Sequence, residues 1–152
     1  MKIEIRTADL HDLEQLISWR MEVLQQVFHL QNKPCYELQK ANQEYYQKAL
    51  AEGSHFAVFA QNEGNIIGCG GVCFYQEMPS PDNPSGECAY LMNIYTRSEY
   101  RKHGVGEKII LSLIREARHR KITKIYLETS DCARSLYEKL GFTDMNDYLI
   151  LK

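Results

Sequence analysis

Apolar residues in the first part of the chain recur at intervals of three and four, the spacing of one face of an α-helix. They fall at Leu13, Leu16, Ile17, Met21, Leu24, Val27 and Phe28. Asp9 is placed to cap this helix, and Asp12 would lie in its first turn. We therefore predict an amphipathic helix that begins shortly after Asp9.

Three further helices are indicated. Pro34 disfavours helical geometry at Lys33 and so separates the first helix from a second, more polar one over about residues 40–51. A third runs from Val105 to Ala117 on apolar positions four residues apart, and a short fourth spans Ala133–Leu140. Each of these helices has one apolar face to bury against another element of the fold.

Strands are predicted where polar and apolar residues alternate, or where short apolar runs are bounded by turn residues. Asn62–Asn65 is a turn signal between two such runs and predicts a β-hairpin. Glycines at positions 68, 70 and 71 indicate a bulge or a close backbone approach in its second strand. The predicted strands are Lys2–Arg6, His55–Ala60, Asn65–Tyr75, Glu87–Thr96, Ile122–Thr129 and Asp147–Leu151.

The element order is then β-α-α-β-β-β-α-β-α-β. Because hairpins and crossover helices both occur, we expect one α/β (α+β) domain over residues 1–152 with a mixed sheet.

Composition narrows the possible functions. Lys plus Arg total 18 and Asp plus Glu 20, so the net charge of −2 disfavours a nucleic-acid binder that neutralises phosphates. No apolar run approaches the ~18–20 residues that a membrane span requires. The start of the chain alternates charged and apolar residues, unlike a signal peptide. We expect a cytoplasmic protein that binds neither nucleic acid nor membrane.

The five cysteines and five histidines give no metal or disulfide signature. An odd number of cysteines without a CxxC pair argues against a disulfide framework. The histidines show no HExxH spacing. We expect no metal site.

Gly104 and Gly106 lie where a long strand gives way to a helix. The amides at a helix N-terminus favour phosphate, but a GxG pair alone also fits an ordinary solvated turn. The P-loop pattern GxxxxGK[ST] is absent. Ile109 stands where a dinucleotide fingerprint requires its third glycine, so that fold is disfavoured as well.

Three segments together resemble the GNAT superfamily of acyl-CoA-dependent N-acetyltransferases. Asn93–Gly106 matches the family's strand followed by [RQ]xxGx[GA]. Lys124–Thr129 matches the next strand, and Ala133–Phe142 matches the A-x-x-L-Y-x-x-x-G-F ending. The resemblance implies a GNAT-like twisted sheet that is splayed between its fourth and fifth strands, with acetyl-CoA as cosubstrate.

The resemblance also implies residue roles. Main-chain amides would bind the CoA pyrophosphate at Arg101, Lys102, His103, Gly104, Val105 and Gly106. The pantetheine arm would pair with the strand edge at Ile94, Tyr95 and Thr96. Tyr137 would be the general acid that protonates the departing thiolate. Ser130 stands where many members have an Asn that contacts pantetheine.

The general base and the acceptor are less defined. In the family the base is often a Glu on the strand before the loop, so Glu87 is the candidate here. Tyr90 and Asn93 lie nearer the expected position, but Asn cannot act as a base.

The acceptor pocket should be built from the first two helices, Tyr75–Glu77 and the proline-containing loop. Candidate carboxylates for binding an amine are Glu22, Glu37, Glu44, Glu77, Asp82 and Glu87.

The leading hypothesis is an N-acetyltransferase that acetylates a primary amine of a small molecule or peptide by direct attack in a ternary complex. A homodimer is left open. Polyamines, aminoglycosides, amino acids and peptide N-termini all remain open as acceptors. One alternative is a catalytically silent module that binds acyl-CoA or has a regulatory role. Another is a purely structural interaction domain.

Overall fold

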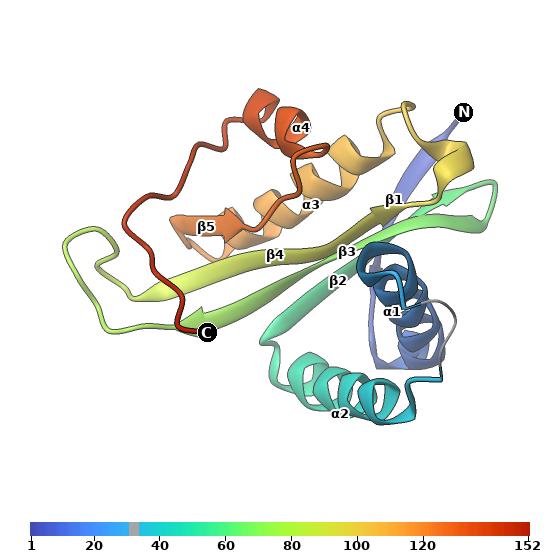
Figure 1. Cartoon of the computed structure of the whole chain (residues 1–152), viewed down its shortest axis with the longest axis horizontal. Coiled ribbons are helices and arrows are strands. Elements are labelled where there is room, and N and C mark those ends of the chain that lie inside the picture. Colours follow the sequence, from blue (N-terminus) through green and yellow to red (C-terminus); the bar gives the residue numbers. More distant parts are fainter. Residues whose placement is uncertain (31–33) are drawn as a thin grey trace.

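The computed structural model describes residues 1–30 and 34–152, and its centre is a five-stranded sheet in the order β1-β2-β3-β4-β5 (Figure 1). Neighbouring strands β1 to β4 pair antiparallel, and β5 lies parallel to β4. The bounds are β1 Ile3–Ala8, β2 His55–Asn62, β3 Asn65–Gln76, β4 Glu87–Thr96 and β5 Lys124–Leu127. The sheet is therefore mixed, as the sequence predicted.

Helices cover both faces of the sheet (Figure 1). On one face lie α1 (Leu13–Phe28) and α2 (Tyr36–Glu52), and on the other α3 (Val105–His119) and α4 (Arg134–Lys139). Each face has its own apolar cluster. Trp19 of α1 and Phe59 of β2 belong to one, and Ile109 and Leu113 of α3 belong to the other. No helix in the described part of the chain is long and apolar enough to cross a membrane.

The predicted helices differ from the observed ones mainly at their starts. Asp9 caps a short 3₁₀ turn, Leu10–Asp12, through a capping box with Asp12, and α1 follows directly. The second helix begins at Tyr36, several residues before its predicted start. No capping side chain marks its N-terminus, so the sequence did not locate this start. The predicted break at Lys33 lies outside the described residues.

The glycines of β3 allow the sheet and its helices to approach closely. A Cβ on Gly70 would lie 2.5 Å from Cγ2 of Ile109 in α3, and one on Gly71 would lie 2.7 Å from Nε2 of His55. The β3–β4 register shifts between Cys69 and Gly71, so β4 carries one extra residue there. The predicted bulge and close approach are both confirmed.

The sheet opens between β4 and β5. Among the described residues only Cys88–Leu91 pairs with Lys124–Leu127, and β4 then continues to Thr96 with no strand paired on that edge. Since parallel strands that diverge leave main-chain groups unpaired, the second half of β4 offers a free edge. This is the predicted splay between the fourth and fifth strands.

The C-terminal segment differs from its prediction. Asp147–Leu151 forms no strand, and β5 is shorter than the predicted Ile122–Thr129. The segment runs past β5 without pairing (Figure 1), and Leu149, Ile150 and Leu151 are almost fully exposed. A short apolar run makes a strand only where a neighbouring edge accepts its hydrogen bonds.

Candidate active site

The first turn of α3 forms an open cradle for an anion. Its N-cap, Gly104, has φ +80° and no side chain caps the helix. Lys102 also has a positive φ, +64°, and the loop from Arg101 to Gly104 is exposed. Because the amides of a first helical turn have no intrahelical acceptors, they point outward together with the positive end of the helix dipole. Alternating positive-φ residues before a helix form the kind of concavity that binds phosphate.

The loop before α3 is tied to β4 by its side chains. Arg101 Nε donates to the Thr96 carbonyl at 2.9 Å, and its guanidinium lies 5.7 Å from the centre of the Tyr95 ring. His103 Nδ1 lies 3.3 Å from the Tyr100 carbonyl. These contacts hold the cradle against the free edge of β4.

A bulge redirects β4 just before the segment expected to meet the thioester. Asn93 has φ +59°, and Asn93 and Ile94 together lie opposite Gly70. Tyr95 and Thr96 pair with β3 on one side only. A bulge of this kind turns main-chain groups near Ile94 out of the ladder.

Tyr137, on α4, is 9% exposed and packs edge-on against Phe142 at 5.8 Å. Burial raises the pKa of its phenol above the ordinary value. A tyrosine that stays protonated at neutral pH suits the role of a proton donor. Ser130 is exposed in the turn between β5 and α4, where its Oγ lies 3.3 Å from Cys132 Sγ.

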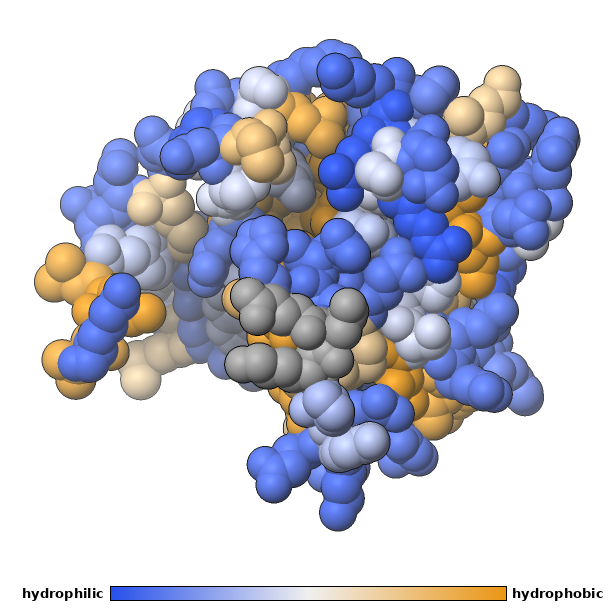
Figure 2. Space-filling model, turned by 45° about the vertical axis from the view of Figure 1, so that its right-hand side comes forward, coloured by the Kyte–Doolittle hydropathy of each residue, from blue (hydrophilic) through white to orange (hydrophobic). Residues whose placement is uncertain are grey.

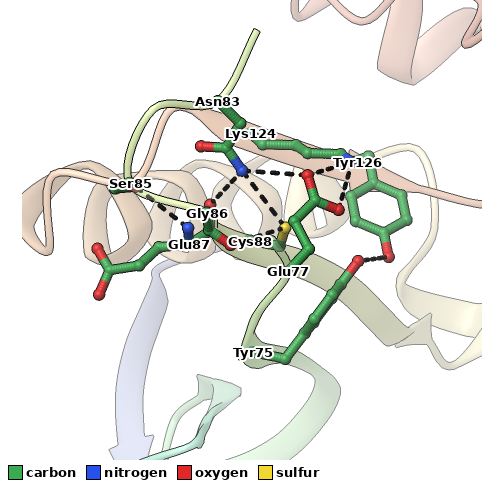
Figure 3. A network of polar contacts seen from close by, with 9 residues as sticks. All are labelled: Tyr75, Glu77, Asn83, Ser85, Gly86, Glu87, Cys88, Lys124 and Tyr126. Carbon is green, nitrogen blue, oxygen red and sulfur yellow. Dashed lines mark hydrogen bonds and ion pairs between the residues drawn. The ribbon is translucent and has the colours of Figure 1, made fainter. Parts of the chain in front are cut away.

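Glu87 is not brought to the opened part of the sheet. It is exposed at the first residue of β4, seven positions before Ile94, or roughly 23 Å along an extended strand. Its carboxylate points away from Glu77 and Lys124 in Figure 3. Direct contact between Glu87 and an amine beside Ile94 is therefore out of reach.

Two of the carboxylates considered for the acceptor are already paired. Glu77 accepts from Lys124 Nζ at 2.9 Å through both oxygens, and Asn83 Nδ2 donates to it at 3.3 Å (Figure 3). Arg97 holds Glu22 with bonds of 2.9 and 3.1 Å and lowers the pKa of that carboxyl. The other candidates, Glu37, Glu44, Asp82 and Glu87, are exposed.

Sequence reasoning missed a small pocket on the α1/α2 side of the sheet. It has a volume of about 200 Å³ and is lined by Arg20, Asn42, Tyr45, Tyr46, His55, Cys73, Met92 and Asn93. A signal was present: Arg20 lies four residues after Leu16 and four before Leu24, on the apolar face of α1. A cation at an apolar position of a helix indicates a specific contact.

Three tyrosines line the sheet beyond this pocket. Tyr90 stacks on Tyr126 at 5.0 Å, and the Tyr126 hydroxyl is hydrogen-bonded to that of Tyr75. Burial is the largest cause that raises the pKa of Tyr90 to about 12, and the nearby Glu128 carboxylate is the second. Tyr90 is therefore a neutral phenol at physiological pH.

A sheet that opens between parallel strands lies next to a helix N-terminus without a side-chain cap, so a free strand edge adjoins an anion cradle. Comparisons with known proteins identify the family. The model of the acetyltransferase (GNAT) family matches residues 19–142, so the chain belongs to this family. The family resemblance and the fold expected from the sequence are both confirmed.

Individual relatives agree with this assignment. A 5-NmdU N-acetyltransferase of Pseudomonas phage PaMx11 is 27% identical over 103 residues, 68% of each chain. A predicted acetyltransferase from Clostridium acetobutylicum, solved with acetyl-CoA, is 28% identical with a TM-score of 0.88, covering 99% of this chain and 96% of that one. The protein is an acetyl-CoA-dependent N-acetyltransferase.

A more distant structure shows the fold alone. Glucosamine-6-phosphate N-acetyltransferase from Arabidopsis thaliana is 16% identical with a TM-score of 0.73, covering 100% of this chain and 99% of that one.

The described residues contain no group of three or more His, Cys, Asp or Glu side chains arranged to hold a metal ion.

Proposed function

We propose that the enzyme transfers the acetyl group of acetyl-CoA to a primary amine of a small molecule or peptide by direct attack in a ternary complex. The observation that carries this proposal is the free edge of β4 beside the uncapped start of α3. The pyrophosphate binds the amides of Arg101–Gly106. The pantetheine arm lies along Ile94–Thr96 as an added strand and passes Ser130.

The chemistry requires removal of one proton and delivery of another. An alkylamine with a pKa near 10.4 is neutral in only about one molecule in 2,500 at pH 7. A base takes the amine proton as the C–N bond forms, and an amide near Ile94 stabilises the oxyanion. When the C–S bond breaks, the Tyr137 phenol protonates the CoA thiolate.

The general base remains a prediction. Glu87 lacks direct reach to Ile94, so it could act only through intervening waters. Replacement of Glu87 by Gln tests it: a role as base requires loss of kcat together with loss of the acidic limb of the pH profile. An unchanged profile would remove Glu87 from the mechanism.

The proposed function is tested by incubating the purified protein with acetyl-CoA and a panel of amines while free thiol is measured. Thiol release that depends on the amine supports transfer. Binding of acetyl-CoA without turnover of any amine would favour the silent binding module. A melting temperature that acetyl-CoA does not raise would favour the interaction domain.

Three further expectations accompany the proposal. Residues 1–152 form one catalytic domain, the protein acts in the cytoplasm, and it forms a homodimer. The family assignment and the fold are compatible with all three.

A further inference from the structure

Arg20 differs from the other half-buried arginines. Arg6, Arg97 and Arg120 each have a carboxylate partner, at 3.0, 2.9 and 3.2 Å respectively. Arg20 has none among the described residues. Its partners are two neutral amide oxygens: Nε donates to Asn42 at 3.2 Å and Nη1 to Asn93 at 3.0 Å.

No Asp or Glu lines the pocket around Arg20, and no aromatic ring lies beneath its guanidinium in the described structure. A guanidinium has five N–H donors, and within the described residues Arg20 uses two of them. A half-buried cation without a counter-ion destabilises the fold, and a bound anion would remove that cost.

The pocket lies next to the expected reaction centre. Met92 and Asn93 line it, and Ile94 follows directly on the bulged strand. Its position between α1, α2 and β4 puts a bound molecule on the face opposite α3 and α4 (Figure 1). An amine acceptor entering from this face would therefore meet Arg20 before it reaches the thioester.

We infer that Arg20 binds an anionic group, a carboxylate or a phosphate, carried by the amine acceptor. The inference rests on the proposed function and names its substrate class. The planar guanidinium suits bidentate contact with such oxyanions. The pocket selects amines that also carry a negative charge and disfavours polycationic amines, since these would place a second cation beside Arg20.

The experiment uses pairs of acceptors, one member with the anion and one without it, and compares wild type with each variant on the same pair. Glucosamine 6-phosphate is paired with glucosamine, and an α-amino acid with its amide, so that the two pairs distinguish phosphate from carboxylate. We expect wild-type kcat/KM to be about 10- to 100-fold higher for at least one anionic member than for its neutral twin. Arg20→Gln should abolish this preference mainly through KM. Arg20→Lys should keep part of it.

Two controls separate charge recognition from loss of structure. Arg115→Gln removes an exposed arginine from α3 and should leave the preference unchanged. The Kd of each variant for acetyl-CoA, measured by calorimetry, should equal that of wild type. Equal losses toward both members of a pair in Arg20→Gln would show that Arg20 only tethers Asn42 and Asn93, and would overturn the inference.

Direct binding keeps the inference testable if no amine is acetylated. Calorimetry then compares glucosamine 6-phosphate and the amino acid with their neutral twins, in wild type and in Arg20→Gln. Tighter binding of an anionic member that Arg20→Gln abolishes would support the site even though the proposed function had failed. If no anionic member binds or reacts better than its twin, the inference is wrong.

Discussion

Tyr137 provides the most direct test of the chemistry at single-residue scale. The phenol is nearly buried and its pKa is raised, so the neutral donor form persists at physiological pH. We expect Tyr137→Phe to lower kcat by about 10²- to 10⁴-fold, because the thiolate would leave without a proton donor. Steady-state kinetics gives the rate, and calorimetry should show an unchanged Kd for acetyl-CoA. An unchanged kcat would exclude Tyr137 as the general acid.

His55 predicts a pH dependence of stability. It is 6% exposed, its Nδ1 lies 2.7 Å from the Tyr45 hydroxyl, and burial together with Arg20 lowers its pKa to about 4. Between pH 6.5 and 4 the unfolded chain therefore takes up a proton that the folded chain does not. Stability should fall as the pH drops through this window, by at most about 3 kcal/mol from this group.

Urea unfolding at pH 7 and pH 4.5 measures this effect. His55→Gln, which cannot take up the proton, should lose less stability between these two pH values than wild type does. Because other groups titrate in the same range, the difference between the two proteins isolates His55. Parallel curves would mean that His55 does not titrate abnormally.

At the scale of elements, the sequence predicted those features that leave a local signature. Apolar spacing located α1 and α3, and the turn signal located the β2–β3 hairpin. The [RQ]xxGx[GA] motif marked the start of α3. The observed opening of the sheet agrees with the resemblance, although no local pattern marks where β4 leaves β5.

Features that depend on distant partners were missed. The sequence predicts a last strand over Asp147–Leu151, but no strand edge in the described residues pairs with this segment. The position of Arg20 on the apolar face of α1 marks it as unusual, but its partners Asn42 and Asn93, 22 and 73 residues away, are seen only in the structure. Sequence reasoning cannot supply such contacts, because long-range packing decides them.

The packing of α3 on the bulged part of the sheet gives a prediction for an element. A Cβ on Gly70 would lie 2.5 Å from Ile109 and 3.2 Å from Leu113. Gly70→Ala should therefore lower the free energy of unfolding by about 1–3 kcal/mol through overpacking. Chemical denaturation measures the loss.

Gly106→Ala is the matched control for that substitution. Its Cβ would meet only a Leu136 side-chain carbon, at 3.4 Å, and its φ is not in the positive region. We expect a change within about 0.5 kcal/mol, as for a substitution that causes no clash. If both variants were equally stable, the close approach of α3 to β3 would not limit the residue at position 70.

At the scale of the whole molecule, β4 links the two halves of the site. Its Ile94–Thr96 edge faces the cradle of α3, while Met92 and Asn93 line the pocket under α1 and α2. Cosubstrate and acceptor would thus approach from opposite faces of the sheet and meet at the bulge. This arrangement fits direct transfer, since neither substrate has to leave before the other binds.

The C-terminal segment carries the last prediction. Leu149, Ile150 and Leu151 are almost fully exposed. Apolar side chains lie at the surface at the left margin of Figure 2. Exposed apolar segments promote association, so we expect a concentration-dependent dimer. Sedimentation velocity should show that replacing Leu149 and Leu151 by Ser shifts the protein toward monomer, whereas Glu63→Gln, in the distant β2–β3 turn, should not. Identical sedimentation of wild type and the Ser variant would exclude this segment as the contact.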